Sequence, residues 1–204
     1  MAPKPDIAIA LETGGTAIVP TETVYGLAAR ADNAQAVDRI YQIKGRSFDK
    51  PLALCVKDMS AAVLYGQMSG FAKDLAAAFW PGPLSLVVKA KPGAPKLDAR
   101  LYGENKLGEP TIALRCPQAD WISLIDPDIP IALTSANPSG ENAPRTLQEA
   151  KAYMGDKVDY TYNGADCAVG ISSTIMTVEE RGFKILRQGS INAEDIAPFM
   201  RREA

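Results

Sequence analysis

Hydroxyl, amide and cationic side chains follow the ends of several predicted elements of this chain. They are Thr21, Glu22, Thr23 and Tyr25 after one strand, Lys44 and Arg46 at the end of a helix, Arg115 at the end of a second strand, Thr134, Ser135 and Asn137 at the end of a third, and Arg187 at the end of the last. Open α/β sheets usually bind ligands at their strand ends. Arginine offers a planar charged fork to a carboxylate or phosphate, and lysine offers a compact point charge. The pattern therefore predicts a site for a phosphorylated or carboxylated small molecule.

Each member of this set also has a structural interpretation. Lys44 and Arg46 could complement the dipole at a helix C-terminus, and the hydroxyls of the third strand could cap a turn. The two strand-end arginines could form surface ion pairs. Taken singly, the residues favour these structural roles, and only their number favours a binding site.

Several common kinds of site are absent from the sequence. The 204 residues include no histidine, which excludes Ser-His-Asp and Cys-His nucleophilic schemes and histidine metal sites. Neither G-x-x-x-x-G-K-[ST] nor G-x-G-x-x-G occurs, so the two commonest phosphate loops are missing. Any chemistry must depend on carboxylates, hydroxyls, lysine and arginine, or on a substrate that needs no strong base.

Composition and cysteine usage indicate a cytoplasmic protein with one domain over residues 1–204 and no membrane contact. Hydrophobic residues make up 47%, and the net charge of -2 gives no general attraction to nucleic acid. Cys55, Cys116 and Cys167 are too few and too scattered for a disulfide framework, and the first two read as buried packing residues. No apolar run is long enough to span a membrane, and the N-terminus lacks a signal-peptide pattern.

Hydrophobic periodicity and breaker residues predict an α/β fold. Helices are predicted over 3–13, from a cap at Asp32 or Asn33 to Gly45, over 69–79, from 146 to 153 and over 191–200. Strands are predicted over 16–20, 52–56, 85–89, 111–115, 130–135, 159–163, 173–178 and 183–188. Because helices and strands do not alternate strictly, a twisted mixed sheet is favoured over a doubly wound parallel one.

Two surface features have open interpretations. Residues 90–110 are rich in proline, glycine and charge, which suits either a mobile lid over a site or an ordinary solvated loop. Basic residues outnumber acidic ones over 30–57, which could create a weak tRNA or double-stranded RNA contact, although a solvated helix face explains the excess better.

The motifs closely resemble those of the YrdC/Sua5-type threonylcarbamoyl-adenylate synthase family. The matching segments are VPTETVYGLAARADN, RIYQIKGRSFDKPLAL, FWPGPLSLVV, TIALRCP, PIALTSANPSG, the Ser-Ser-Thr-Ile at 172–175 and ILRQGSI. They extend from about Gly15 to Ile191 in family order, and the chain resembles the short branch without a C-terminal extra domain. The resemblance implies a twisted, open mixed sheet with flanking helices and a large concave cavity.

The resemblance also implies an activity and its residues. The expected reaction converts L-threonine, bicarbonate and ATP, with Mg²⁺, to L-threonylcarbamoyl-adenylate and pyrophosphate, and the product passes to the complex that transfers threonylcarbamoyl to tRNA. The implied threonine contacts are Thr23, Arg115, Ser135 and Ser173. The implied nucleotide contacts are Lys44, Arg46, Lys50, Thr111, Asn137, Arg145 and Arg187, of which Lys44 and Arg46 are the expected catalytic pair.

Three positions depart from the family pattern. Ser85 stands where threonine is common, Cys55 where many longer members have a substrate-contacting histidine, and Met176-Thr177 where an aspartate is frequent. The last change leaves a metal role unassigned. Two alternatives therefore stay open: an RNA- or nucleotide-binding paralogue without synthase activity, and a related carbamoyl-adenylate-forming enzyme that acts on another acceptor.

Overall fold

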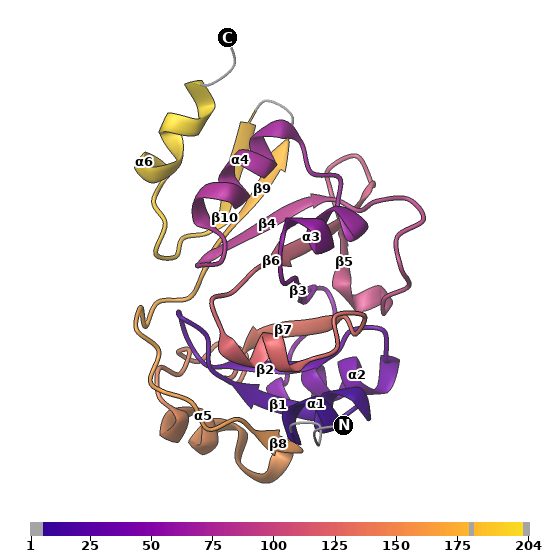
Figure 1. The fold of residues 1–204 in the computed structure, drawn as a ribbon, viewed down its shortest axis with the longest axis vertical. Helices are drawn as coiled ribbons and strands as arrows, with labels where there is room; N and C mark the ends of the chain where they lie inside the picture. Colours follow the sequence, from indigo (N-terminus) through magenta and orange to yellow (C-terminus); the bar gives the residue numbers. More distant parts are fainter. Residues whose placement is uncertain (1–5, 180–181, 202–204) are drawn as a thin grey trace.

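The computed structural model describes residues 6–179 and 182–201, and Figure 1 shows their arrangement. Residues 3–5 of the predicted first helix lie outside this described part. The helices are α1 (Asp6–Glu12), α2 (Ala34–Lys44), α3 (Met59–Tyr65), α4 (Gly70–Phe79), α5 (Leu147–Met154) and α6 (Ala193–Ile196), with 3₁₀ turns at Ala99–Leu101, Asp120–Leu124, Gly155–Lys157 and Ala197–Arg201. The strands are β1 (Thr16–Val19), β2 (Gly26–Arg30), β3 (Ala53–Cys55), β4 (Leu84–Lys89), β5 (Tyr102–Glu104), β6 (Pro110–Arg115), β7 (Ile131–Ser135), β8 (Tyr160–Thr161), β9 (Thr174–Glu179) and β10 (Gly182–Arg187).

The described strands form one mixed sheet, as the sequence predicts. Their order is β10-β9-β4-β6-β3-β7-β2-β1-β8, and β5 pairs with β6 beside this path. The pairs β4–β9, β3–β6 and β1–β8 are parallel, and the other pairs are antiparallel. Within the described residues, the three-residue strand β3 joins two halves of the sheet. We call β10, β9, β4 and β6 the first half, and β7, β2, β1 and β8 the second half.

The two faces of the sheet differ because side chains alternate along each strand. In β6, Ile112 and Leu114 point into the main hydrophobic core, whereas Thr111, Ala113 and Arg115 line a cavity. Helices α2, α3 and α4 cover the core face. On the opposite face, a smaller core that includes Trp121 covers only the second half of the sheet. The remaining surface of that face is open, and the cavity lies there.

Helix α2 forms where the sequence predicts it and carries two of the predicted site residues. The Asn33 side chain caps it by accepting from the backbone N–H groups of Gln35 and Ala36 at 3.0 and 3.1 Å. Gly45 ends it in the left-handed conformation, with φ of 58°. This sharp stop places Lys44 in the last helical turn and Arg46 just beyond it.

Some elements differ from the prediction. Strand β2 is the segment GLAAR, whose small residues give no strand signal. The sequence also does not predict α3, which has only seven residues. The segment 90–110 is not structureless, because β5 pairs with β6 and Leu97 and Leu101 are buried. The only part of it without a regular element that also lines the cavity is the turn at residues 105–109. Any lid must therefore be limited to this turn.

No helix within the described residues has the length and apolar content needed to cross a bilayer.

Candidate functional site

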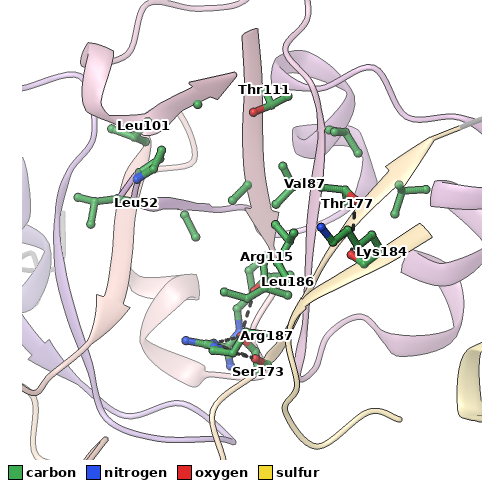
Figure 2. A pocket seen from close by; sticks show the side chains of 18 of the residues that line it. Leu52, Val87, Leu101, Thr111, Arg115, Ser173, Thr177, Lys184, Leu186 and Arg187 are labelled. Carbon is green, nitrogen blue, oxygen red and sulfur yellow. Dashed lines mark hydrogen bonds between the residues drawn. The ribbon is translucent and has the colours of Figure 1, made fainter. Parts of the chain in front are cut away.

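The concave face of the sheet contains a cavity of about 1450 Å³. Ordinary small-molecule pockets have volumes of roughly 300–1,000 Å³, so this one has room for two ligands side by side. Its walls come from both halves of the sheet. Figure 2 shows Arg115, Arg187 and Ser173 together at one end, with Thr111 and Leu101 at the other. Of the predicted site residues, Arg46, Thr111, Arg115, Ser135, Ser173 and Arg187 line the cavity.

Arg115 is the most constrained of the lining cations. Its Nη2 donates to Glu22 Oε1 at 2.8 Å and to Thr23 Oγ1 at 2.6 Å. The side chains of Arg115 and Glu22 are each only 10% exposed. Arg115 Nε is buried and has no hydrogen-bond partner among the described residues. A buried charged donor without an acceptor is unusual in a native protein, and an anionic ligand would satisfy it.

Thr23 supports Arg115 from the loop between β1 and β2. Its hydroxyl is fully buried, lies 2.9 Å from the hydroxyl of Thr21, and is not part of the cavity wall. Thr21 does line the cavity. The structure therefore places Thr23 behind Arg115 rather than in direct contact with the cavity.

Arg187 and Ser173 form a second polar group next to Arg115. Arg187 Nη2 donates to the Ser173 carbonyl at 2.8 Å and to Ser173 Oγ at 3.1 Å. Ser173 Oγ in turn lies 3.1 Å from Ser85 Oγ, and Ser85 pairs with Arg115 in the β4–β6 ladder. The hydroxyl of Ser85 therefore belongs to this polar group beside Arg115.

The charge on Arg187 is unfavourably placed in the unliganded protein. Desolvation, and then the charges of Arg115 and Arg46, lower the pKa of Arg187 below its ordinary value. The charges of three arginines thus act on one region of the cavity. An anion in the cavity would relieve this repulsion.

Lys44 lies just behind the cavity wall and ties α2 to the segment after β7. Its ammonium donates to the carbonyl of Asn137 at 2.6 Å and also to the carbonyl of Ser135. Burial, and next the charge of Arg46, lower the pKa of Lys44 to about 7. Because the ammonium and the neutral amine are then similar in energy, an anion nearby would favour the charged form.

Arg46 shapes the loop that follows α2. Its guanidinium donates to the carbonyls of Lys50 and Pro51 at 3.0 and 3.1 Å, which closes residues 46–51 into a compact turn. Arg46 and Pro51 line the cavity, whereas the predicted nucleotide contact Lys50 is exposed outside the wall.

Three other predicted contacts have different positions. Thr111 lies four residues along β6 from Arg115, about 13 Å away at the usual rise of a strand. Asn137 is buried behind the wall, with Oδ1 unpartnered among the described residues. Arg145 is exposed, and its side chain crosses the face of Gly170, where even a Cβ would lie 2.1 Å from Arg145 Nε. Arg145 thus packs on the 164–172 segment and does not line the cavity.

The two strand cysteines have structural environments. Cys116 is buried as predicted, while Cys55 is only partly buried and contacts the smaller core. Burial raises the pKa of the Cys55 thiol to about 12, so it stays protonated near neutral pH. Cys55 is not part of the cavity wall. It therefore does not replace, at the wall, the substrate contact of the family's histidine.

Sequence reasoning missed the central role of Glu22. The pattern marks it only as one polar residue among several, because a pairing with Arg115, 93 positions away, has no local signal. Thr21 and Ser85 also contribute to the site through contacts that only the folded sheet creates.

Comparisons with known proteins identify the family. The family model Sua5_yciO_yrdC, described as "Telomere recombination", matches residues 9–189. A putative threonylcarbamoyl-AMP synthase of Methanocaldococcus jannaschii is 35% identical, over 90% of this chain and 84% of its own length. The threonylcarbamoyl-AMP synthase of Bacillus subtilis is 36% identical, over 87% of this chain and 50% of its own length.

A solved structure gives the same result for the fold. The crystal structure of P. abyssi Sua5 complexed with L-threonine superimposes with a TM-score of 0.84 and 30% identity, over 96% of this chain and 56% of that one. The chain thus spans about half the length of the B. subtilis and P. abyssi proteins and most of the M. jannaschii protein.

Proposed function

Because the chain belongs to the Sua5/YciO/YrdC family, we propose that it is an L-threonylcarbamoyladenylate synthase. The proposed reaction joins L-threonine, bicarbonate and ATP to give L-threonylcarbamoyladenylate and pyrophosphate. The observation that carries the proposal is the gathering of Arg115, Arg187 and Arg46 around one cavity with room for an amino acid and a nucleotide. Threonine is the amino acid bound in the P. abyssi relative.

The chemistry proceeds in two steps that suit a site without histidine. The amine of threonine attacks the carbon of bicarbonate, and water leaves, to give an N-carboxylate. An oxygen of this carboxylate then attacks the α-phosphorus of ATP while the bond to pyrophosphate breaks. Since the second nucleophile is already an anion, it needs no base to remove a proton. Positioning and charge neutralisation can therefore supply most of the catalysis.

Arg115 is the proposed hydrogen-bond donor to the threonine carboxylate. Its buried Nε lacks a partner among the described residues, and the neighbouring hydroxyl of Ser173 can orient the polar groups of the amino acid. Ser135 lines the same cavity and is a further proposed contact. Arginine suits this role because its N–H groups match the geometry of a carboxylate.

Arg187 and Arg46, which line the cavity, are the proposed partners of the phosphates, and Lys44 is proposed to join them from just behind the wall. The repulsion among the arginines and the lowered pKa of Lys44 both disappear when a polyanion enters. Asn137 supports this group by holding Lys44 through its carbonyl, and Thr111 is proposed to contact the nucleotide at the far end of the cavity. Lys50 and Arg145 would have to move inward to reach the nucleotide.

Magnesium is proposed to enter with ATP as part of the substrate. The described residues include no group of three or more aspartate, glutamate or cysteine side chains that could hold a metal ion. The cationic cavity does not fit a protein-held dication, whereas phosphate oxygens are suitable ligands for Mg²⁺. Met176 is buried in the core and Thr177 lines the cavity, so neither restores the missing aspartate.

The proposed partners outside the active site follow from the product. A mixed anhydride hydrolyses readily, so the cavity must retain it until the tRNA threonylcarbamoyl-transferase complex accepts it. We therefore propose a cytoplasmic location. A weak direct contact with tRNA through residues 30–57 stays a secondary proposal.

The test is a pyrophosphate-release assay with mass spectrometry of the product. Pure protein, ATP, Mg²⁺, bicarbonate and L-threonine should yield the adenylate, and omission of either threonine or bicarbonate should abolish pyrophosphate release. Release without both would indicate a plain ATPase. Nucleotide binding without any threonine affinity would favour the binding paralogue, and adenylate formation with another acceptor would favour the related carbamoyl-adenylate-forming enzyme.

A further inference from the structure

The environment of Arg115 leaves only part of its guanidinium available to a ligand. A guanidinium has five N–H groups, two of them on Nη2. Both Nη2 protons are in use, one by Glu22 Oε1 at 2.8 Å and one by Thr23 Oγ1 at 2.6 Å. Nε is buried without a partner among the described residues. A substrate carboxylate must therefore use the N–H groups that Glu22 and Thr23 leave over, or displace one of these two residues.

Glu22 is held in place by contacts that do not involve Arg115. Its Oε2 accepts from the backbone N–H of Gln118 at 3.0 Å, and its backbone carbonyl accepts from the N–H of Val169 at 2.9 Å. The side chain is 10% exposed. Glu22 is thus held through its carboxylate and through its backbone. We therefore expect it to stay in place when a ligand binds.

Thr23 is equally fixed. Its hydroxyl lies 2.9 Å from that of Thr21, and Thr21 Oγ1 donates to the carbonyl of Val24 at 2.7 Å. The two acceptors of Arg115 Nη2 are thus both part of a rigid framework. Only the N–H groups of Nε and Nη1 are left for a new acceptor, and because both two-point edges of a guanidinium include Nη2, they can be used only one at a time.

We propose that Glu22 is a positioning residue for substrate recognition, which orients Arg115 so that its unpartnered N–H groups receive the carboxylate of the amino acid. This inference rests on the proposed function, since it takes threonine as the ligand of Arg115. Glu22 also balances one of the arginine charges, so Arg115 binds the carboxylate through directed hydrogen bonds more than through excess charge.

The test compares Glu22→Gln with the wild-type protein. Glutamine keeps one oxygen but presents an NH₂ group in place of the other, so either Arg115 or the Gln118 N–H loses its acceptor. We expect KM for L-threonine to rise about 10-fold or more, as for the loss of a charge-assisted hydrogen bond, with KM for ATP changed less than about 2-fold. Glu22→Asp keeps the charge with a shorter reach and should give a smaller rise in KM.

The matched control is Asp32→Asn, which breaks another arginine–carboxylate pair, with Arg30, outside the cavity wall. It should leave both KM values unchanged. A double-mutant cycle with Arg115→Lys shows whether Glu22 acts through Arg115: the loss in the double variant should be smaller than the product of the two single losses. A merely structural role would predict independent effects and a general loss of melting temperature.

Several outcomes would overturn the inference. Tighter threonine binding by Glu22→Gln would show that Glu22 competes with the substrate for Arg115. Equal rises in both KM values, or additive effects in the cycle, would show that Glu22 only supports the fold. If wild-type protein binds no threonine by calorimetry, the proposed function fails and the inference with it. Wild-type binding that Glu22→Gln leaves unchanged refutes the inference alone.

Discussion

The ammonium of Lys44 lies 2.6 Å from the backbone carbonyl of Asn137, so the C-terminus of α2 is fastened to the segment that follows β7. The hydrogen-bond acceptors of this buried ammonium are carbonyl oxygens and not carboxylates. A carboxylate would have held the lysine fully protonated, whereas here burial and Arg46 lower its pKa to about 7. Lys44 is therefore able to change its protonation state when a ligand arrives.

We predict that ATP binding is accompanied by proton uptake at Lys44. At pH 7.5–8 a pKa of about 7 leaves the unliganded amine mostly neutral, and a nearby phosphate raises the pKa and so favours protonation. Calorimetric titrations in two buffers of different ionisation enthalpy should show this uptake. Lys44→Arg, which is charged at every working pH, should lose it, and the difference between the two proteins removes any contribution from ATP itself. Identical buffer dependence in both would contradict the prediction.

Arg187→Ala should weaken ATP binding without destabilising the protein. Removing one charge-assisted contact to a phosphate costs roughly 1.5–3 kcal/mol, or about 10- to 150-fold in affinity. Folding should suffer little, because the loss of the hydrogen bonds from Arg187 to Ser173 is offset by the end of its repulsion from Arg115 and Arg46. Calorimetry and thermal melting measure the two effects. Lys184→Ala, on the same strand and also at the cavity wall, is the control and should change ATP affinity less.

Arg115→Lys should have the complementary effect, with weaker threonine binding and nearly intact ATP binding. Lysine keeps the charge, but its single ammonium lacks the planar set of N–H groups through which arginine contacts Glu22 and Thr23 and can still face a carboxylate. Titration of the variant with threonine and with a non-hydrolysable ATP analogue separates the two affinities. Equal losses for both ligands would mean that Arg115 does not distinguish between them.

The ion pairs of Arg100 should contribute to stability in a pH-dependent way. Arg100 contacts Asp98 at 2.7 Å and Asp38 at 2.6 Å, which joins the segment before β5 to α2. Burial alone would raise the pKa of Asp98, but the hydrogen bonds and charge of Arg100 lower it overall. The unfolded chain then binds this proton at a higher pH than the folded protein does. The stabilisation is present above the unfolded pKa of about 3.9 and is lost as the pH falls through the folded pKa.

The measurement is urea denaturation of Asp98→Asn and wild type at pH 7 and in acid. At pH 7, Asp98→Asn should lower the free energy of unfolding by about 1–2 kcal/mol, which is between the values for exposed and for buried ion pairs. This difference in unfolding free energy between the variant and the wild type should be smaller at the acidic pH. The more exposed pair of Lys89 and Glu109 provides the control, and Glu109→Gln should cost less at both pH values. A difference that persists unchanged in acid would show that the Asp98 charge is not responsible.

Trypsin should cleave the 90–110 segment after Lys106 and spare Arg100. Lys106 lies in the turn between β5 and β6, next to Leu107, which is 80% exposed. The carbonyl of Arg100 accepts from Leu52 N at 3.1 Å and from Tyr41 Oη at 3.2 Å, so this backbone is not free to enter a protease. ATP with threonine should slow the cut if the turn closes over the cavity. Lys106→Gln removes the trypsin site and should abolish this cut. Rapid cleavage after Arg100 would contradict the structure.

The sequence predicts the mixed sheet, the cap and stop of α2 and the gathering of cations, because these depend on local periodicity and on residues at element ends. It does not predict β2, whose alanines and glycine have low strand propensity but pack between α1 and α2 in the folded protein. The sequence also does not distinguish the residues that line the cavity from the residues that hold them in position. Thr23 and Thr21 are two positions apart in sequence, yet only Thr21 lines the cavity, since that distinction depends on where Arg115 lies.

The short strand β3 has a mechanical consequence. Three residues carry the hydrogen-bond ladder between the two halves of the sheet, and the ion pair of Arg115 with Glu22 spans the same junction. A bound substrate that contacts Arg115 in the first half and Ser135 in the second would connect the two halves across this junction for as long as it stays bound. Local opening of the backbone there should then be suppressed by ligand, because binding stabilises the closed form by mass action. Amide hydrogen exchange at residues 53–55 would thus report occupancy of the cavity, even though the strand's backbone lies beneath the ligands.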